Sequence, residues 1–304
     1  MMPEGRHKCF TPHFFSTPWL LAIRPKTLWA AVGPVLVGSA MAYSLGAFEP
    51  LPALACLSVA LLLQIGVNLS NDYFDFAKGI DTEERLGPTR VTQAGLIAPG
   101  RVKAAMIGAM LLALVPGTYL IIRGGWWLGI IAGASIIAGL AYSGGPYPLA
   151  SHGLGDICVF LFFGPVAVCG TYYVQTLTLS DAVVWISMAL GLLITAILVV
   201  NNLRDINTDR NSGKTTLAVV LGVKGTLIEY HLLIIGAYII PVILVILDQI
   251  SPWCLLMLLS APLAFKLCLS IVRNPEGPGL NHLLSQTARL TLIYSLLLSF
   301  GFIL

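Results

Sequence analysis

The chain has 304 residues, of which 57% are hydrophobic and only 10% are charged, and its mean hydropathy is +0.87. Soluble domains carry about 25% charged residues, so this composition excludes an ordinary soluble domain and predicts a polytopic protein of the lipid bilayer. The net charge of +3 gives no support for a nucleic-acid partner. Six cysteines without a C-x-x-C pair and five histidines without ligand spacing argue against a disulfide framework or a zinc centre.

Taken in chain order, residues 1–18 lack the apolar region and cleavage site of a signal peptide, and we expect them to form a cytoplasmic N-terminal arm. A transmembrane helix needs about 20 mostly apolar residues. That criterion predicts an all-α fold, with nine transmembrane helices in a single domain over 1–304. The nine segments are 27–46, 51–71, 102–122, 125–142, 155–176, 182–201, 226–247, 252–272 and 286–304.

Lysine and arginine gather before the first segment and in the loops that follow the second, sixth and eighth. The positive-inside rule therefore places the N-terminus and these loops in the cytoplasm, and the C-terminus on the other side. The loops after the second and sixth helices are long and polar, and such loops are usually functional or disordered. We expect them to cap a central cavity between the helices.

The first of these loops begins with a polar cluster at the end of the second helix. Asn68, Asp72 and Asp75 follow one another at i, i+4 and i+7 and would share one helical face. Like charges at this spacing repel unless a cation lies between them, and oxygen ligands suit a hard divalent cation. Asp81 belongs to the same stretch, although Gly79 is expected to end the helix before it.

A second cluster ends the sixth helix, where Asn201, Asp205 and Asp209 lie at i, i+4 and i+8. The recurrence suggests an internal repeat, with units that begin near helices 1–2 and 5–6 and face one another across the cavity. Opposed aspartates ringed by Arg and Lys describe a site for Mg²⁺ and a diphosphate. The alternative is solvated charges paired with nearby basic residues, which we favour for Glu83 and Glu84 and leave open for Asp75 and Asp81.

The pair of motifs, N-D-x-x-D at 71–75 and D-x-x-x-D at 205–209, resembles the UbiA superfamily of intramembrane aromatic prenyltransferases. Finer motifs are similar to its 1,4-dihydroxy-2-naphthoate polyprenyltransferase branch. They are R-P-K-T-L at 24–28, G-P-T-R at 87–90, Y-S-G-G-P-Y-P at 142–148, G-L-G-D at 153–156, F-F-G at 162–164 and Y-Y-x-Q at 172–175. Much of the superfamily has a lysine after the tyrosine at 142, and its absence here argues against a benzoate-type acceptor.

The resemblance implies roles for individual residues. Tyr142 would stabilise an allylic cation through its ring, although an aromatic residue of the membrane interface is an equally good interpretation. His152 could instead be a solvated loop residue, and Arg24 and Lys26 could serve only to orient the chain. The implied assignments are Asn68, Asp72, Asp75, Asp81, Asn201, Asp205 and Asp209 for two Mg²⁺ ions, Lys78, Arg90, Arg204 and Lys214 for the diphosphate, Arg24, Lys26, His152 and Asp156 for the acceptor, and Tyr142, Asp72 and Asp205 for catalysis.

The activity implied is Mg²⁺-dependent, decarboxylating transfer of a polyprenyl group to 1,4-dihydroxy-2-naphthoate, giving demethylmenaquinone for menaquinone synthesis. A bacterial cytoplasmic membrane, with the active site on the cytoplasmic side, is the expected location. Alternatives are phytyl transfer in phylloquinone synthesis, and prenyl transfer to homogentisate, 4-hydroxybenzoate, a porphyrin or a glycerol phosphate. A cation-coupled transporter is a further alternative, although transporter sites usually lie near the bilayer midplane. The sequence does not indicate an oligomeric state.

Overall fold

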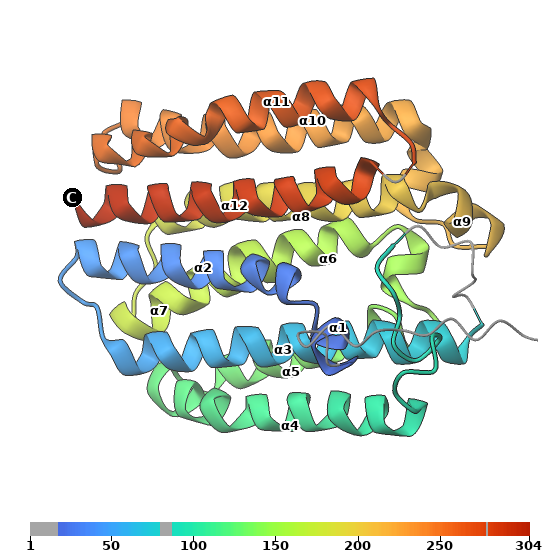
Figure 1. The fold of residues 1–304 in the computed structure, drawn as a ribbon. Coiled ribbons are helices and arrows are strands. Elements are labelled where there is room, and N and C mark those ends of the chain that lie inside the picture. Colours follow the sequence, from blue (N-terminus) through green and yellow to red (C-terminus); the bar gives the residue numbers. More distant parts are fainter. Residues whose placement is uncertain (1–17, 80–86, 278) are drawn as a thin grey trace, which may run out of the picture.

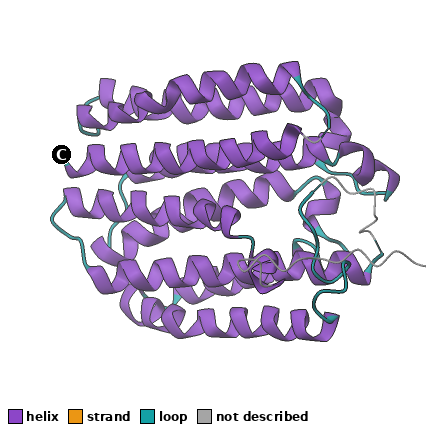
Figure 2. Ribbon diagram, viewed as in Figure 1, coloured by secondary structure: helices purple, strands orange, loops and turns teal. Residues whose placement is uncertain are grey.

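The computed structural model describes residues 18–79, 87–277 and 279–304. The predicted N-terminal arm, apart from Pro18, and Asp81, Glu83 and Glu84 lie outside these ranges. All regular secondary structure in the described part is helical (Figure 2), which confirms the all-α prediction. The long helices run side by side as one bundle (Figure 1).

The helical elements follow one another with short connections, except between α3 and α4. In chain order they are α1 (Pro18–Ile23), α2 (Pro25–Ser44), α3 (Pro50–Ala77), α4 (Pro99–Gly124), α5 (Trp127–Ala141), η1 (Leu149–His152), α6 (Gly155–Leu161), η2 (Phe162–Cys169), α7 (Gly170–Thr176), α8 (Asp181–Arg204), α9 (Ile206–Asn211), α10 (Leu217–Ile246), η3 (Pro252–Ser260), α11 (Ala261–Arg273) and α12 (Gly279–Ile303). The prediction of a second long loop, after the sixth span, is wrong, because α9 and the first turns of α10 form there.

Eight helical segments in the described ranges are long and apolar enough to cross a membrane, so the chain is an integral membrane protein. The remaining predicted span, 125–142, corresponds to α5, whose 15 residues extend about 22 Å, less than the roughly 30 Å hydrocarbon core. The predicted nine spans are thus eight long segments and one shorter helix. The segment Gly155–Thr176 runs through α6, η2 and α7 and is π-helical around Pro165, which has no N–H to donate.

Local sequence signals account for several helix ends. Pro25, Pro50 and Pro99 occupy first-turn positions, where their missing N–H has no helical partner to lose. At the other end of α3, helical geometry stops at Ala77, and Gly79 takes a left-handed φ of 66°. The sequence prediction that Gly79 ends this helix is confirmed.

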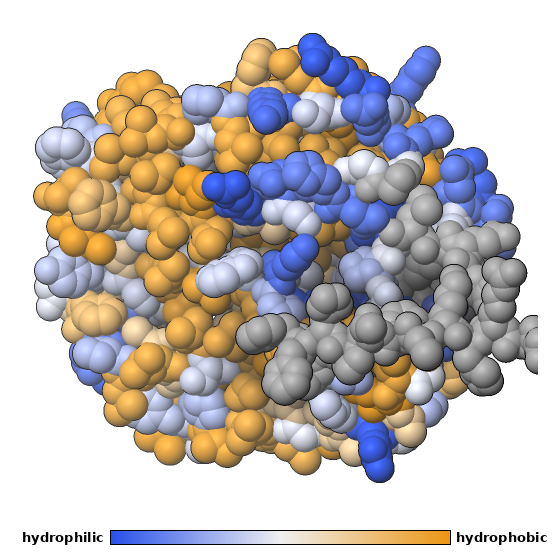
Figure 3. Space-filling view, viewed as in Figure 1, coloured by the Kyte–Doolittle hydropathy of each residue, from blue (hydrophilic) through white to orange (hydrophobic). Residues whose placement is uncertain are grey.

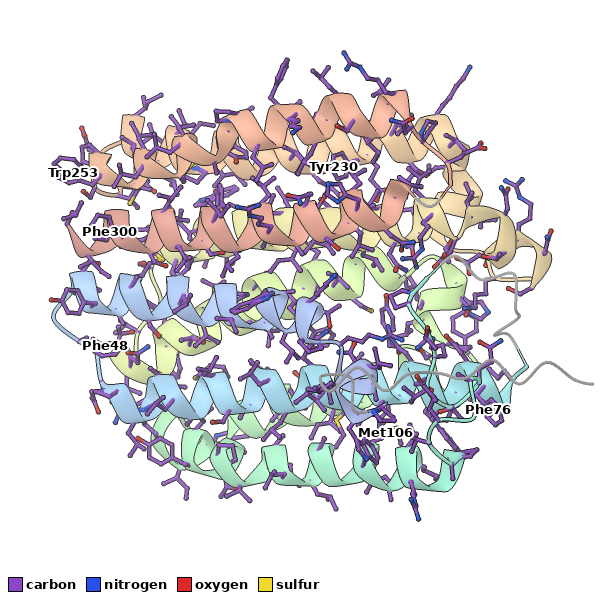
Figure 4. All side chains as sticks on the ribbon, viewed as in Figure 1. Phe48, Phe76, Met106, Tyr230, Trp253 and Phe300 are labelled. Carbon is purple, nitrogen blue, oxygen red and sulfur yellow. The ribbon has the colours of Figure 1, made fainter. Side chains whose placement is uncertain are left out.

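The main core packs α2, α8, α10 and α12 around one another. Two fully buried tyrosines satisfy their hydroxyls inside it: Tyr230 meets Thr287 Oγ1 at 3.0 Å, and Tyr294 donates to the Ala237 carbonyl at 2.6 Å. In Figure 4 Tyr230 lies among the upper helices, whereas Phe48 and Trp253 mark one end of the bundle and Phe76 the other. Hydrophilic residues gather toward the α9 end (Figure 3), which distinguishes the two ends.

Candidate active site

A cavity of about 1160 Å³ lies inside the bundle and receives residues from both halves of the chain. One part of its wall is polar and charged. Another part, formed by α2, α3, α4, α5 and η2, is apolar. The charged and amide residues on the wall include Arg24, Lys26, Asn68, Asn71, Asp75, Arg90, Asn201, Asp205, Asp209 and Lys214, and the apolar residues include Val35, Cys56, Leu63, Gly117, Leu128, Ile131 and Val166.

At the end of α3, Asn71 and Asp75 line the cavity. Their i, i+4 spacing puts both on one helical face. Asp75 is buried, and its Oδ2 accepts a hydrogen bond from Arg90 Nη2 at 2.7 Å. Arg90 is itself buried and comes from the loop after α3, so this ion pair joins the helix to the loop at the cavity wall.

Asp72 is not part of the cavity wall. Its Oδ2 accepts from the Val91 amide and its Oδ1 from the Thr92 amide, both at 3.0 Å. Asn68 does line the cavity, but its Nδ2 donates to the Ile23 carbonyl at 2.9 Å and so ties α3 to the end of α1. Of these two predicted ligands, Asn68 therefore lies on the cavity wall, whereas each oxygen of Asp72 accepts a backbone amide away from it.

The second cluster, at the junction of α8 and α9, is centred on Arg204. This buried guanidinium donates to both oxygens of Asp205, at 2.8 and 2.6 Å. It also donates to the amide oxygens of Asn201 and Asn281, each at 2.9 Å. Bidentate Arg–carboxylate pairing is geometrically specific, so Arg204 fixes Asp205 and Asn201 at the cavity wall and connects them to α12.

Lys214 joins the two clusters. Its Nζ lies 3.9 Å from Asp75 Oδ1 and 3.8 Å from Asp209 Oδ1. The adjacent Thr215 amide donates to the Ser151 carbonyl at 2.8 Å and attaches this loop to the segment after α5. The carboxylates of the two motifs thus lie on either side of one ammonium group, as expected if the motifs form two halves of a single polar site.

Tyr142 follows α5 and lines the cavity, but Lys78 does not. Lys78 Nζ donates to the Ser143 carbonyl at 2.7 Å, and Ser143 Oγ donates to Asn71 Oδ1 at 2.5 Å. Desolvation lowers the pKa of Lys78, opposed by the nearby charge of Asp75. Of the four predicted diphosphate ligands, Arg90, Arg204 and Lys214 lie on the wall, whereas Lys78 acts from behind it through Ser143.

Of the four predicted acceptor residues, two line the cavity and two do not. Arg24 and Lys26 line the cavity, where Arg24 holds a left-handed φ of 52° between α1 and α2. His152 and Asp156 are absent from the cavity wall. The His152 ring stacks on Tyr147 at 3.6 Å between centroids and its Nδ1 meets the Pro148 carbonyl at 2.8 Å, while Asp156 is buried in the first turn of α6.

The oxygen atoms on this wall suit Mg²⁺ as one part of its coordination, with the remaining ligands coming from elsewhere. Carboxylate and amide oxygens come from Asn71, Asp75, Asn201, Asp205 and Asp209. In the part of the chain that the structure describes, no three His, Cys, Asp or Glu side chains converge as a ready-made metal cage. Mg²⁺ usually binds one or two carboxylates together with phosphate oxygens and waters. The wall therefore suits Mg²⁺ that arrives with a diphosphate.

Sequence reasoning missed Asn71, Ser143 and Asn281. The signal for Asn71 was present, because Asn71 and Asp75 repeat the N-x-x-x-D spacing of Asn201 and Asp205. The other two carry no such signal. Ser143 and Asn281 reach the site only because α5 and α12 pack beside it.

The fold and this cavity define a helical membrane protein with a charged pocket at one end and an apolar chamber behind it. A UbiA homolog from Archaeoglobus fulgidus bound to GPP and Mg²⁺ has a similar fold, with a TM-score of 0.64 and 17% sequence identity, over 94% of this chain and 99% of that chain. At that identity the likeness concerns the fold alone.

Sequence comparison gives the family. The UbiA prenyltransferase family matches residues 31–295. The chain is 39% identical over 292 residues to the 1,4-dihydroxy-2-naphthoate octaprenyltransferase of Escherichia coli (strain K12), covering 94% of this chain and 95% of that protein. It is 38% identical over 279 residues to the enzyme of the same name from Mycobacterium tuberculosis, covering 91% and 94%. The chain belongs to the UbiA prenyltransferase family.

Proposed function

We propose that this protein transfers a polyprenyl group from a polyprenyl diphosphate to 1,4-dihydroxy-2-naphthoate, with loss of CO₂, to give demethylmenaquinone. The observation that carries the proposal is the pair of polar clusters joined by Lys214 beside an apolar chamber. The two relatives compared above, which bear the name of this activity, support the choice of acceptor.

The polar end of the cavity would hold the diphosphate. Arg90, Arg204 and Lys214 supply positive charge on the wall, where it offsets the negative charge that grows on the leaving group as the C–O bond breaks. Mg²⁺, when bound, would add the charge of a divalent cation to that stabilisation. Asn71, Asp75, Asn201, Asp205 and Asp209 are our proposed ligands, together with Asn68, which also lines the cavity.

The apolar chamber would hold the start of the prenyl tail. Each CH₂ buried away from water contributes about 0.8 kcal/mol, so the tail favours this chamber and the surrounding lipid over water. Tyr142 also lines the cavity, directly after α5. Its ring face can stabilise an allylic cation, and the apolar wall around that cation excludes water that would otherwise capture it.

Arg24 and Lys26 are the proposed contacts for the acceptor carboxylate. Both lie on the cavity wall near the α1–α2 junction. Attack by the aromatic ring on the allylic carbon forms the new C–C bond. Departure of the carboxylate as CO₂ returns its bonding electron pair to the ring, so aromaticity is restored. Because the clusters lie beside the basic loops, we also propose that the site faces the cytoplasm from a bacterial cytoplasmic membrane.

The test supplies membranes containing the protein with labelled polyprenyl diphosphate and 1,4-dihydroxy-2-naphthoate. Mass spectrometry should detect demethylmenaquinone only when Mg²⁺ is present. Parallel reactions with 4-hydroxybenzoate, homogentisate and phytyl diphosphate test the other substrates, and product from one of these alone would overturn the assignment. Ion flux without release of diphosphate would instead identify a transporter.

A further inference from the structure

Asp72 stands in the middle of the N-D-x-x-D motif, yet it points away from the cavity that its neighbours line. Helical spacing alone does not separate Asp72 from Asp75, because residues three apart are neighbours on a helix; the contacts of the Asp72 side chain do. Asp72 is 2% exposed. Each of its two oxygens accepts one backbone amide, from Val91 and Thr92, at 3.0 Å, so the buried carboxylate is directed at the loop after α3.

The two donor amides, of Val91 and Thr92, belong to a compact turn, which we call the 90–97 turn. Within it the Ala94 amide donates to the Arg90 carbonyl at 3.0 Å, and the Leu96 amide to the Val91 carbonyl at 2.9 Å. Val91 is fully buried and packs into a cluster of apolar side chains with Leu69 of α3. The turn is therefore docked twice on α3, by the Val91 side chain and by the Asp72 carboxylate.

Arg90 is the residue immediately before these two anchored amides. Its guanidinium lies on the cavity wall and bonds Asp75 at 2.7 Å, one helical turn from Asp72. If the anchored amides shifted, the Arg90 backbone would shift with them, and both its contact with Asp75 and its position toward a bound diphosphate would change. The carboxylate thus controls a cavity residue that it does not touch.

We propose that Asp72 is a positioning residue that docks the 90–97 turn and thereby places Arg90 at the diphosphate end of the cavity, and that it does not bind Mg²⁺. This inference rests on the proposed function, since it assigns how one diphosphate contact is held. It predicts a different response to magnesium for two aspartates that are three residues apart on the same helix.

The first test compares Asp72→Asn and Asp72→Ala with Asp75→Asn, a matched loss of one charge on α3. Asp72→Asn should raise the donor KM by about 10-fold and leave the Mg²⁺ concentration for half-maximal activity within about 2-fold, while Asp72→Ala, which removes both acceptors, should raise the donor KM further. Asp75→Asn should raise the Mg²⁺ requirement by about 10-fold or more. A rise in that requirement for Asp72→Asn equal to that for Asp75→Asn would overturn the proposal.

The second test combines Asp72→Asn with Arg90→Gln. If Asp72 acts through Arg90, the double variant should have the donor KM of Arg90→Gln alone, because residues in one network do not act additively. Independent, multiplying effects would contradict the proposal.

A third readout needs no prenyl transfer, and so separates a failure of this inference from a failure of the proposed function. Mg²⁺ with inorganic diphosphate should raise the melting temperature of the wild type and Asp72→Asn equally, and that of Asp75→Asn less. Limited trypsin digestion of the folded protein should cut after Arg90 faster in Asp72→Asn than in wild type, since the buried turn is released. Equal cutting, or loss of the Mg²⁺ effect in Asp72→Asn, would refute the docking role.

Discussion

The two polar clusters share a spacing in sequence but hold their carboxylates by different means. At α8–α9 the cation that fixes Asp205 is its immediate neighbour, Arg204, which also holds Asn201 and Asn281. At α3 the cation that fixes Asp75 is Arg90, from a loop 15 residues further along the chain. The first arrangement forms largely within one helix end, and the second forms only when the loop docks.

The two clusters also differ in how firmly their ion pairs are held by the surrounding helices. The two ion pairs are almost equally buried, with side chains 1% and 10% exposed for Arg204 and Asp205 and 5% and 10% for Arg90 and Asp75. Only the Arg204 pair is bidentate and completed by amides from two helices. The α3 cluster adjoins the 90–97 turn and one side of the Lys214 contact. We infer that the α8–α9 cluster is the fixed half of the diphosphate site and the α3 cluster the half that depends on loop position.

The largest effect should come from breaking the fixed half with Asp205→Asn. This removes a proposed Mg²⁺ ligand and leaves the buried Arg204 charge without its carboxylate, which typically costs about 3–5 kcal/mol in unfolding free energy. Activity should fall by at least about 100-fold, and the melting temperature should fall as well. Product formation and thermal unfolding measure the two losses.

The matched control is Asp181→Asn, in the exposed first turn of the same helix. Its activity and melting temperature should stay close to wild type. If Asp205→Asn kept normal activity at normal Mg²⁺ concentrations, neither the site nor the contrast between the two halves would hold.

Lys214→Gln removes the charge that lies between the halves. Since Nζ is close to both Asp75 and Asp209, its loss should raise the donor KM by about 10-fold, comparable to losing one hydrogen bond to a charged group. Lys224→Gln, on the exposed side of α10, is the control and should leave KM unchanged. Donor titrations at saturating naphthoate give the comparison, and an unchanged KM for Lys214→Gln would remove Lys214 from the site.

Lys78→Gln tests whether a basic residue behind the cavity wall contributes less to donor binding than Lys214, which lies on the wall. Its ammonium bonds the Ser143 carbonyl, so we expect the donor KM to rise by only about 2- to 3-fold, in line with one partly exposed hydrogen bond. The same donor titration measures it. An effect larger than that of Lys214→Gln would reverse the order that the structure indicates.

Gly117→Leu should impair reaction with long donors and have little effect on short ones. Gly117 lines the apolar chamber, and a Cβ added there would meet nothing within 4 Å, so a side chain can start from this position without a clash at its Cβ and take up space in the chamber. For long prenyl diphosphates kcat/KM should fall by about 10-fold, the scale for changes in a hydrophobic pocket. Geranyl diphosphate should react nearly as in wild type.

Gly108→Leu provides the control, because Gly108 lies on the same helix, is exposed, and likewise has open space around an added Cβ. It should leave the preference for donor length unchanged. The same loss for both variants would show that the effect comes from α4 itself and not from the chamber.

The sequence by itself determined the class of fold and indicated the family. Long apolar segments have few physical solutions other than membrane helices, and eight of the nine predicted spans are helices of sufficient length. Regular spacing is local, so the sequence could group Asn201, Asp205 and Asp209, although in the structure α8 ends at Arg204 and α9 begins at Ile206. The same spacing links Asn71 with Asp75, but sequence reasoning missed Asn71 and chose Asn68 with Asp72 and Asp75, which are as regularly spaced.

Tertiary structure decided between those two faces, because periodicity shows which residues share a side and not what that side meets. Packing turned Asp72 toward the 90–97 turn, and Asn71 and Asp75 toward the cavity. It also turned Lys78 toward Ser143 and brought Asn281 from the distant α12 to Arg204. These contacts join residues far apart in the chain, so local sequence patterns carry no record of them, and only the packing of the helices fixes which polar groups line the cavity.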